Sequence, residues 1–441
     1  MKKMSKVKKI LIIIVILLLT VMAIVFPIIL RSEAYFNWQL NQHGKYLSIN
    51  FLSDSVIHNN SRLYNYEGLT ILDMSGTEAE MGYSHGYLLG NYIKYSVEYT
   101  LTIIGNLSGY NEMHDNILPY YLLRNSTYYS EEIGAIYEGA MDSGADLYVE
   151  VLGRNWDVMD LWMLNTIQDW YQVACSGVGV WGNSSNTGKT IIGRDLDFYY
   201  DRHGYITQLY TIMIFRGNES RYDIVSFSLP GIIGIISGFN SEGVWMHMNS
   251  SNGDMTKEHN RTGISLAIRR FLEREDGTEI ASRSQNYFLE QNIAHSVLLM
   301  VGSKSADSPV FVLEVRDSVV GYRGEVNSSD DYVILTNHEM VNKEPQYCYR
   351  YSRYLSDINE YLTTGDQLID NNELLLSQQH CGQNGTINAI QFCPIDLTFR
   401  IGYSRIVNVP FGKKWSDDDL VQGPYDPLLE KWFSLNELLG N

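Results

Sequence analysis

The stretch Cys175-Ser176-Gly177-Val178-Gly179-Val180-Trp181, followed by the residues from Lys189 to Phe198, decides how this chain folds. Both stretches are rich in apolar and β-branched residues, which favour extended strands. The segment between them, Gly182 to Gly188, contains Gly, Asn, Ser and Thr and is typical of a turn. The sequence therefore predicts a β-hairpin here.

The register of this hairpin brings three chemically useful side chains together. A turn centred near Ser185 places Cys175 opposite about residue 196, so Arg194 and Asp197 return to the level of Cys175. A cation beside a thiol lowers the pKa of the thiol, and a carboxylate can orient a nearby amine. The pattern predicts a reactive cysteine at one end of a sheet.

The rest of the chain changes texture at the hairpin. Before it, from about residue 77 to residue 171, apolar residues recur every three to four positions, as in helices. Gly82, Gly86 and Gly90 lie four apart on one helix face, where they would let another backbone approach closely. Beyond the hairpin, short β-rich runs alternate with a helix near residues 264–273. This order predicts a helical prosegment followed by a layered core of helices and strands.

The N-terminus has the features of a signal anchor. Five lysines precede an apolar run from Ile10 to Leu30, which at about 1.5 Å per residue is long enough to cross a bilayer. The lysines favour the cytoplasmic side, so residues 1–34 are expected to form a cytoplasmic tip and membrane anchor, with the remainder extracytoplasmic. Cleavage as a signal peptide near Ala34 is the alternative, which would give a secreted protein.

The charge balance excludes one class of partner. The formal net charge is −18, and it falls to −23 when the five N-terminal lysines are left out. Because a phosphate backbone would be repelled, nucleic acid is not expected as a partner.

The four cysteines allow two disulfides, or one disulfide and two free thiols. We expect Cys381 to pair with Cys393, which leaves Cys175 free to react. The sequence has no CxxC or Cys/His spacing of a metal site, so no metal is predicted. Nine Asn-x-Ser/Thr sequons fit an extracytoplasmic surface.

Several motifs now point to one group of proteins. Ala174-Cys175-Ser-Gly, followed by Gly193-Arg-Asp-Leu-Asp-Phe198, resembles the start of the mature chain in cholylglycine hydrolases, penicillin V acylases and acid ceramidases. Other matches resemble the acyl-coenzyme A:isopenicillin N acyltransferase family, and they are Glu80 to Gly86, Glu132 to Gly144, Gly238 to Val244, Leu335 to His338 and Ser352 to Tyr354. They follow that family's order from about Gly76 to Gly402.

This resemblance implies an α+β fold, the four-layer αββα sandwich of the N-terminal-nucleophile (Ntn) hydrolases. It implies a precursor that cuts itself between Ala174 and Cys175, with residues 35–174 retained as a prosegment subunit and residues 175–441 as the catalytic core. It also implies a cofactor-free enzyme that hydrolyses a small-molecule N-acyl amide. The α-amine freed at Cys175 titrates near 7.7 and can take the proton of the thiol.

The resemblance also assigns roles to individual residues. Asp197 would hold the α-amine, and Arg194 would stabilise the thiolate and the substrate. Asn337 would donate a side-chain N–H, and Asn240 a backbone N–H, to the oxyanion of the intermediate. Arg353 would brace the site from the adjacent helix.

Each assigned residue also has a purely structural alternative. Arg194 and Asp197 could form a cross-strand ion pair, and Asn337 could cap the turn that follows it. Asn240 is a natural turn residue before Gly243, and Arg353 could lie on a helix surface. Two departures from the group also stand out: Ser176 replaces the commoner Thr, and Asp195 replaces the usual Asn, which would add a negative charge beside the nucleophile.

Other functions remain open from the sequence. Cys175 could pair with His338, as in papain-like enzymes, which would need no self-cleavage. The acyl group could be transferred to an amine instead of water, or the fold could carry an inactive site and serve as a membrane-anchored binding protein. A nucleotide-binding loop at Gly182 to Thr190 is rejected, because five residues separate its glycines and a strand follows it.

Overall fold

The computed structural model describes residues 55–119, 129–169, 174–197, 209–255, 262–291, 293, 295–305, 309–316, 319–324, 330–341, 348–382, 386–403 and 430–439. Within these ranges no helix combines the length and the apolar character needed to cross a bilayer. The predicted membrane segment, residues 10–30, lies outside them and stays a prediction.

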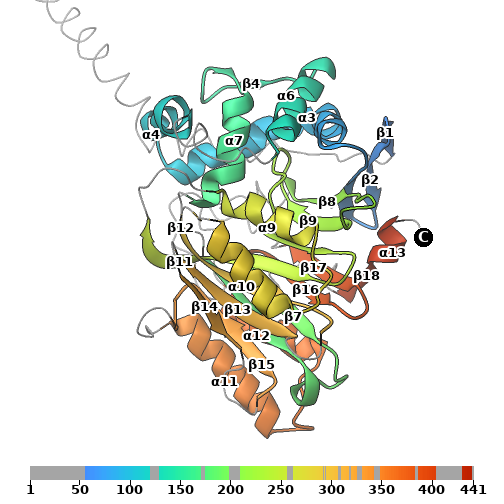
Figure 1. Cartoon of the computed structure of the whole chain (residues 1–441), viewed down its shortest axis with the longest axis vertical. Helices are drawn as coiled ribbons and strands as arrows, with labels where there is room; N and C mark the ends of the chain where they lie inside the picture. Colours follow the sequence, from blue (N-terminus) through green and yellow to red (C-terminus); the bar gives the residue numbers. More distant parts are fainter. Residues whose placement is uncertain are drawn as a thin grey trace, which may run out of the picture.

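Two large β-sheets form the centre of the molecule (Figure 1). The ten-stranded sheet has the order β1 (Val56–His58), β2 (Ser61–Tyr66), β3 (Leu69–Met74), β8 (Thr211–Phe215), β9 (Ile224–Ser228), β10 (Ser237–Asn240), β11 (Trp245–Met255), β12 (His295–Gly302), β13 (Val310–Arg316) and β14 (Val319–Arg323). The six-stranded sheet has the order β15 (Tyr332–Leu335), β6 (Ala174–Val180), β7 (Ile191–Asp197), β16 (Thr386–Cys393), β17 (Thr398–Tyr403) and β18 (Phe433–Ser434). A separate two-stranded ribbon joins β4 (Tyr148–Val149) to β5 (Arg154–Asn155).

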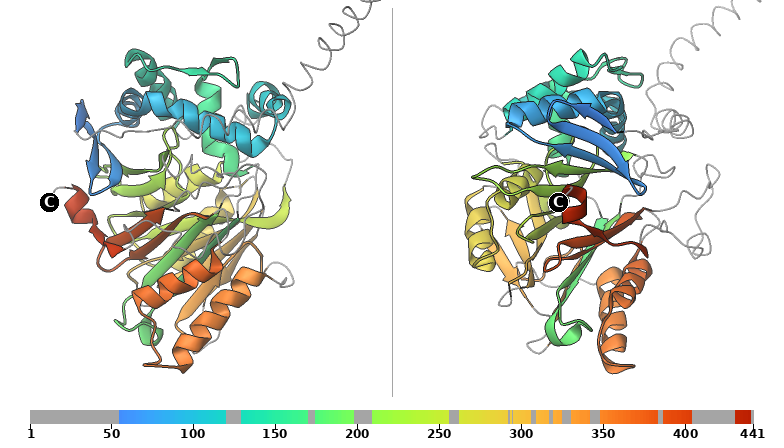
Figure 2. Two further views of the ribbon diagram at one scale, coloured as in Figure 1. Left: turned by 180° about the vertical axis from the view of Figure 1, so that it is seen from behind. Right: turned by 90° about the vertical axis from the view of Figure 1, so that its right-hand side faces the viewer.

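The expected four-layer order is found. Helices α11 (Tyr349–Thr363) and α12 (Asn371–Cys381) cover the outer face of the six-stranded sheet. Helices α9 (Ile264–Leu272) and α10 (Ile280–Glu290) cover the outer face of the ten-stranded sheet. The right-hand view of Figure 2 shows the two sheets stacked between these helix pairs.

The alternation of side chains along the strands explains why two separate apolar layers form. On β12, Leu298 and Met300 enter the core between the sheets, whereas Leu299 and Val301 pack toward the helices. On β6, Val178 joins the core under α11 and α12, whereas Cys175 faces the other sheet. Because successive side chains point to opposite faces, both faces of these strands are apolar and buried.

The prosegment is only partly the helical unit that was predicted. Its helices gather at one end of the sandwich (Figure 1), and they are α3 (Glu78–Ile104), α4 (Leu107–Glu112), the π-helix η1 (Met113–Ile117), α6 (Ser130–Asp142), α7 (Val158–Thr166) and the 3₁₀ turn η2 (Ile167–Asp169). Its strands β1, β2 and β3 extend the ten-stranded sheet, with Ile71 of β3 parallel to Ile212 of β8. Backbone hydrogen bonds therefore join the prosegment to the core, which would hold the two pieces together after a cut at Ala174.

The predicted role of the prosegment glycines in packing is confirmed. A Cβ atom at Gly86 of α3 would collide with the carbonyl oxygen of Ile136 in α6, and one at Gly139 of α6 would collide with the carbonyl oxygen of Tyr83. Close contact between the two helix backbones thus depends on glycine from both sides.

Candidate active site

Cys175 lies on the inner face of β6, opposite Leu196 of β7, in the register that the hairpin predicted. Arg194 pairs with Gly177 and points to the same face, and its Nη2 atom lies 3.1 Å from Cys175 Sγ. Both side chains are fully buried. The structure brings the thiol and the guanidinium together, and the catalytic role of the pair stays a prediction.

The contacts of Arg194 leave its positive charge directed at the sulfur. Its other acceptors are neutral oxygens: Ser237 Oγ at 3.1 Å, Asn249 Oδ1 at 3.2 Å, and the carbonyls of Asp195 at 2.6 Å and Met248 at 3.1 Å. Burial raises the pKa of the Cys175 thiol, and the Arg194 guanidinium acts against that rise. Since an uncompensated buried cation is costly, Arg194 favours the negatively charged form of Cys175.

Asp197 lies on the opposite face of the hairpin, where Ala174 is its cross-strand partner. Its Oδ2 receives a hydrogen bond from Arg350 Nη1 at 3.0 Å, and its Oδ1 receives one from Thr386 Oγ1 at 2.6 Å. Burial raises the pKa of Asp197 to about 6, although the Arg350 guanidinium favours the carboxylate. Asp197 thus pairs with Arg350, and the alternative cross-strand ion pair with Arg194 is not what the structure shows.

Arg350 was not predicted from the sequence, yet it contacts the backbone of the nucleophile directly. It lies in the first turn of α11 and donates to the carbonyl oxygen of Cys175 at 2.6 Å. Its Nη2 also donates to Asn337 Oδ1 at 2.5 Å. One guanidinium therefore links Asp197, Asn337 and the Cys175 peptide. The only sequence signal was a second arginine in the helix that carries Arg353.

Asn337 follows β15 and reaches the nucleophile as predicted. Its Oδ1 accepts a hydrogen bond from the backbone nitrogen of Cys175 at 2.9 Å, and its Nδ2 donates to the carbonyl oxygen of Ser250 at 2.6 Å. In the intact chain the side chain thus holds the nitrogen that scission would turn into the α-amine. The predicted donation to an oxyanion would require the Nδ2 atom to leave Ser250.

The prediction for Asn240 is wrong, and the turn alternative describes it. Its backbone N–H donates to the carbonyl of Val244, and its Nδ2 donates to the carbonyls of Leu272 and Glu275. At about 3.3 Å per residue it lies roughly 10 Å along β10 from Ser237, which contacts Arg194. The asparagine at the site is Asn249, which also donates to the carbonyl of Thr336 at 3.1 Å.

The prediction for Arg353 is also wrong. Its side chain is 39% exposed and pairs with Asp357 one turn further along α11, at 3.2 Å. The surface-helix alternative therefore holds for Arg353. Arg350, about one turn closer to the start of the helix, occupies the position expected of it.

The acidic residue that departs from the group does not lie beside the sulfur. Asp195 pairs with Ser176 across the hairpin and points toward α11 and α12, whereas Cys175 points to the other sheet. Its carboxyl group accepts hydrogen bonds from Tyr354 at 2.6 Å, Gln378 at 3.1 Å and Ser176 at 3.3 Å. Burial, followed by the charge of Asp197, raises the pKa of Asp195 to about 7. The prediction that Asp195 adds a negative charge beside the nucleophile is therefore wrong.

The remaining thiols differ from expectation as well. Cys381 and Cys393 are both free, so the predicted disulfide is absent from the described chain. Cys381 ends α12 and Cys393 ends β16, and both thiols lie in the apolar layer between the helices and the six-stranded sheet.

His338 hydrogen-bonds to a second thiol, that of Cys348, and this contact weakens the papain-like alternative. Its Nδ1 atom lies 2.7 Å from Thr336 Oγ1, and both side chains hydrogen-bond to Cys348 at the N-cap of α11. Burial opposes ionisation of Cys348, but these hydrogen bonds lower the pKa of its thiol to about 6. His338 thus supports Cys348.

An apolar cavity opens beside the nucleophile. It encloses about 650 Å³ of space not filled by atoms, open solvent at its mouth included. Leu196, the cross-strand partner of Cys175, and Tyr210 line it from the core. The prosegment supplies the other wall, with Tyr99, Thr100, Ile103, Leu164, Ile167 and Gln168. A cavity with this apolar lining suits an apolar group attached to a reacting carbonyl.

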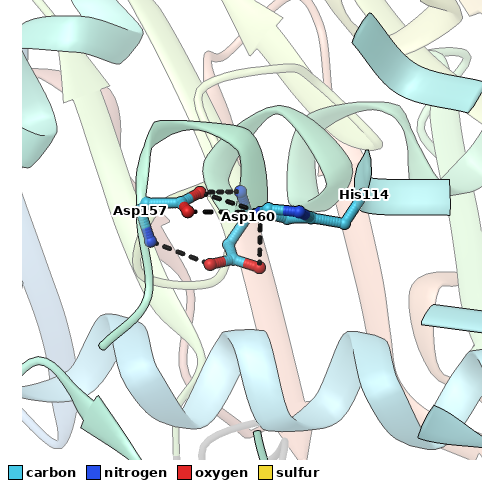
Figure 3. Close-up of side chains that lie close together, drawn as sticks. All are labelled: His114, Asp157 and Asp160. Carbon is cyan, nitrogen blue, oxygen red and sulfur yellow. Dashed lines mark hydrogen bonds and ion pairs between the residues drawn. The ribbon is translucent and has the colours of Figure 1, made fainter. Parts of the chain in front are cut away.

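A cluster of His114, Asp157 and Asp160 lies apart from this site, between η1 and α7 (Figure 3). His114 Nε2 lies 3.0 Å from Asp157 Oδ1. Burial lowers the pKa of the imidazole, but hydrogen bonds to Asp157 and Asp115 raise it, and the net shift is upward. Arg154 already binds Asp160 through two hydrogen bonds of 2.6 and 2.9 Å. Because the positive charge of Arg154 would repel a bound metal ion, we interpret this cluster as a set of structural ion pairs.

The chain matches no protein-family model. Over 313 residues it is 25% identical to an uncharacterized protein of Archaeoglobus fulgidus, which covers 62% of this chain. The chain spans about half the length of that relative.

Several solved structures are similar to this chain. They include an N-acylethanolamine-hydrolyzing acid amidase ortholog from Caenorhabditis elegans, with a TM-score of 0.41 and 15% identity over 50% of this chain and 93% of that chain. A mutant conjugated bile acid hydrolase from Clostridium perfringens gives 0.35 and 10%, over 52% and 89%. Penicillin V acylase from Agrobacterium tumefaciens gives 0.33 and 13%, over 52% and 83%.

These are the kinds of enzyme that the sequence motifs resemble. With TM-scores below 0.5, however, the similarity is no evidence for a shared activity. The case for function therefore rests on the residues around Cys175.

Proposed function

We propose that this chain is an amidase that hydrolyses an N-acyl amide with an apolar acyl group, through an acyl-thioester on Cys175. One observation carries the proposal: a buried thiol contacts Arg194, while Asn337 and Arg350 hold the nitrogen and the carbonyl oxygen of the same residue. A structural cysteine needs neither a cation at its sulfur nor charged and amide contacts to its backbone.

The nucleophile would be activated by its own amine. Burial raises the pKa of the Cys175 thiol, so a base must take its proton. After scission before Cys175, the backbone nitrogen becomes an amine that titrates near 7.7, within reach of the same sulfur. Arg194 would then stabilise the thiolate, and Asp197 would hold Arg350 in place against the Cys175 carbonyl oxygen.

The scission itself is chemically available to Cys175. Its thiol can attack the preceding carbonyl of Ala174, and the acyl group moves from nitrogen to sulfur as the C–N bond breaks and the nitrogen takes a proton. Water then cleaves the thioester, which leaves the carboxylate of Ala174 and the free amine of Cys175. Asn337 already accepts a hydrogen bond from that nitrogen, which supports the strand end during the reaction.

The cavity supports the choice of substrate. Its walls are mainly aliphatic and aromatic, and Leu196 connects it to the level of Cys175. Burying an apolar acyl chain there releases roughly 0.8 kcal/mol per methylene group, which is enough to position a chain of several carbons.

The proposal is tested by cleavage and hydrolysis measured on the same preparation. Dividing the 50.5 kDa chain after residue 174 of 441 gives fragments of about 20 and 30 kDa. The cleaved protein should release the amine from a decanoyl amide, and Cys175→Ala should neither cleave nor hydrolyse. An uncut wild type with full amidase activity would refute the amine mechanism, and a cleaved but inactive protein would refute the amidase.

We further propose that residues 10–30 anchor the enzyme in a membrane with its site on the extracytoplasmic side. The support is the length of the apolar run and the lysines before it. The protein should stay in the membrane fraction after extraction with alkaline carbonate. Its release there would favour cleavage near Ala34.

A further inference from the structure

The apolar cavity beside Cys175 contains one polar group with an unused hydrogen-bonding position. Gln168 of η2 lines the cavity and is 8% exposed. Among the residues that the structure describes, its Oε1 atom is buried and has no hydrogen-bond partner. A buried acceptor without a partner is destabilising, and a bound ligand that donates a hydrogen bond to this oxygen would remove that cost.

Two of the other polar side chains that line the cavity have backbone partners. Thr100 Oγ1 donates to the carbonyl of Ser96 at 3.2 Å, and Ser228 Oγ donates to that of Ile232 at 3.4 Å. Burial raises the pKa of Tyr210 to about 12, so its hydroxyl stays protonated and can serve as a donor. Among the described residues that line the cavity, Gln168 is the one whose buried side-chain oxygen has no hydrogen-bond partner.

The surroundings define what this acceptor would bind. Ile167 and Leu164 flank Gln168 from the prosegment, and Ile387 and Leu196 face the cavity from the core. Such walls disfavour a charged group, because an unpaired charge is costly in an apolar site. The ligand must donate a hydrogen bond to Gln168 Oε1 and must be uncharged. A hydroxyl group on an otherwise apolar chain meets both requirements.

We propose that Gln168 selects acyl chains that carry a hydroxyl group, by accepting its hydrogen bond inside the cavity. This inference rests on the proposed function and names the substrate class more closely. Because Gln168 belongs to the prosegment, it makes the retained prosegment part of the acyl site. The chain without the hydroxyl leaves Gln168 Oε1 unpaired and binds more weakly.

The test measures binding of the free acids, so that it does not depend on hydrolysis. Decanoic acid is compared with 2-, 3- and 10-hydroxydecanoic acid by calorimetry on the purified full chain. One hydroxy isomer should bind wild type about tenfold more tightly than decanoic acid. Gln168→Leu and Gln168→Met, two substitutions of similar size, should each abolish that preference.

Thr100→Val is the matched control, since its hydroxyl lines the same cavity but is already bonded to Ser96. It should keep the preference for the hydroxy acid, whatever happens to the absolute affinity. The inference is overturned if no hydroxy isomer is preferred, if neither acid binds, or if the preference survives both Gln168 substitutions. A buried water on Gln168 would give the first of these results.

Failure of the proposed function would look different. Hydroxy-acid binding that depends on Gln168, without any hydrolysis of the matching amides, would leave an acyl-binding protein with an inactive thiol. Hydrolysis of plain and hydroxylated decanoyl amides at equal rates by wild type and both variants would instead retain the amidase and remove the role of Gln168.

Discussion

The two faces of the β6–β7 hairpin are built from neighbouring residues but serve different purposes. On the inner face, Cys175 and Arg194 meet between the sheets, and among the described residues the hydrogen-bond acceptors of Arg194 are neutral oxygens and the sulfur. On the outer face, Ser176 and Asp195 meet neutral donors from α11 and α12. A charged side chain of this hairpin can therefore influence Cys175 in two ways. It can lie on the inner face and contact the sulfur, or it can lie at the strand end and contact the Cys175 backbone through Arg350.

Asp197 shows how the strand end makes an exception. It shares the outer face with Asp195, but it pairs with Ala174 at the end of the two strands, where Arg350 bonds both to Asp197 and to the Cys175 carbonyl oxygen. Asp195, two residues further into the strand, has no such route. The same residue type therefore belongs to the candidate site at one position and to the helix packing at the other.

The largest effect should separate the two faces at adjacent positions. Cys175→Ala removes the nucleophile and should abolish both self-cleavage and amide hydrolysis. Ser176→Ala removes hydrogen bonds to Asp195 at 3.3 Å and Tyr354 at 3.5 Å on the outer face and should keep cleavage and most activity. The readouts are gel analysis and amine release. Equal losses in the two variants would contradict the division of the faces.

The two carboxylates should differ next. Asp197→Asn weakens the hold on Arg350 and should lower kcat/KM on the order of 100-fold while the protein stays folded. Asp195→Asn keeps an acceptor for Tyr354 and should change kcat/KM less than about threefold. Activity is compared on matched amounts of folded protein, checked by circular dichroism. An inactive Asp195→Asn beside an active Asp197→Asn would reverse the assignment.

The two arginines of α11 provide a smaller contrast. Arg350→Met loses charged hydrogen bonds to Asp197 and the Cys175 carbonyl, and kcat/KM should fall about 10- to 100-fold. Arg353→Met loses a partly exposed ion pair with Asp357 and should stay within about twofold. Steady-state kinetics on both variants decide the matter. A greater loss at position 353 would restore the original sequence prediction.

The smallest effect concerns stability and pH. Burial raises the pKa of Asp195 to about 7, whereas an unfolded aspartate titrates near 3.9. Between these values the folded state keeps a proton that the unfolded state has released, so Asp195 makes stability fall as pH rises from about 4 to 7. Asp195→Asn should therefore gain free energy of unfolding, relative to wild type, from pH 5 to pH 8 in urea titrations. Parallel curves for the two proteins would show that Asp195 keeps an ordinary pKa.

Local pattern was enough to predict the centre of the site. A turn of fixed length sets the pairing of the strands on either side, so the register of Cys175 against residue 196 followed from counting. Asn337 followed in the same way, because a residue just after a strand stays at the end of that strand. The order of the four layers followed from the resemblance to a known group.

Positions that depend on tertiary docking were beyond the sequence. Arg350 and Arg353 lie in one helix, and the choice between them depends on how α11 meets the end of β15. Asn240 and Asn249 differ in whether local turn hydrogen bonds already occupy them. The pairing of β3 with β8 joins segments about 140 residues apart, which no short-range pattern reports.

The central claim is that scission before Cys175 creates the amine that activates its sulfur. N-terminal sequencing of the larger fragment of the purified protein tests this claim most directly. The account predicts that the fragment begins Cys-Ser-Gly-Val. An active protein whose larger fragment begins at any other residue, or whose chain remains whole, would contradict it.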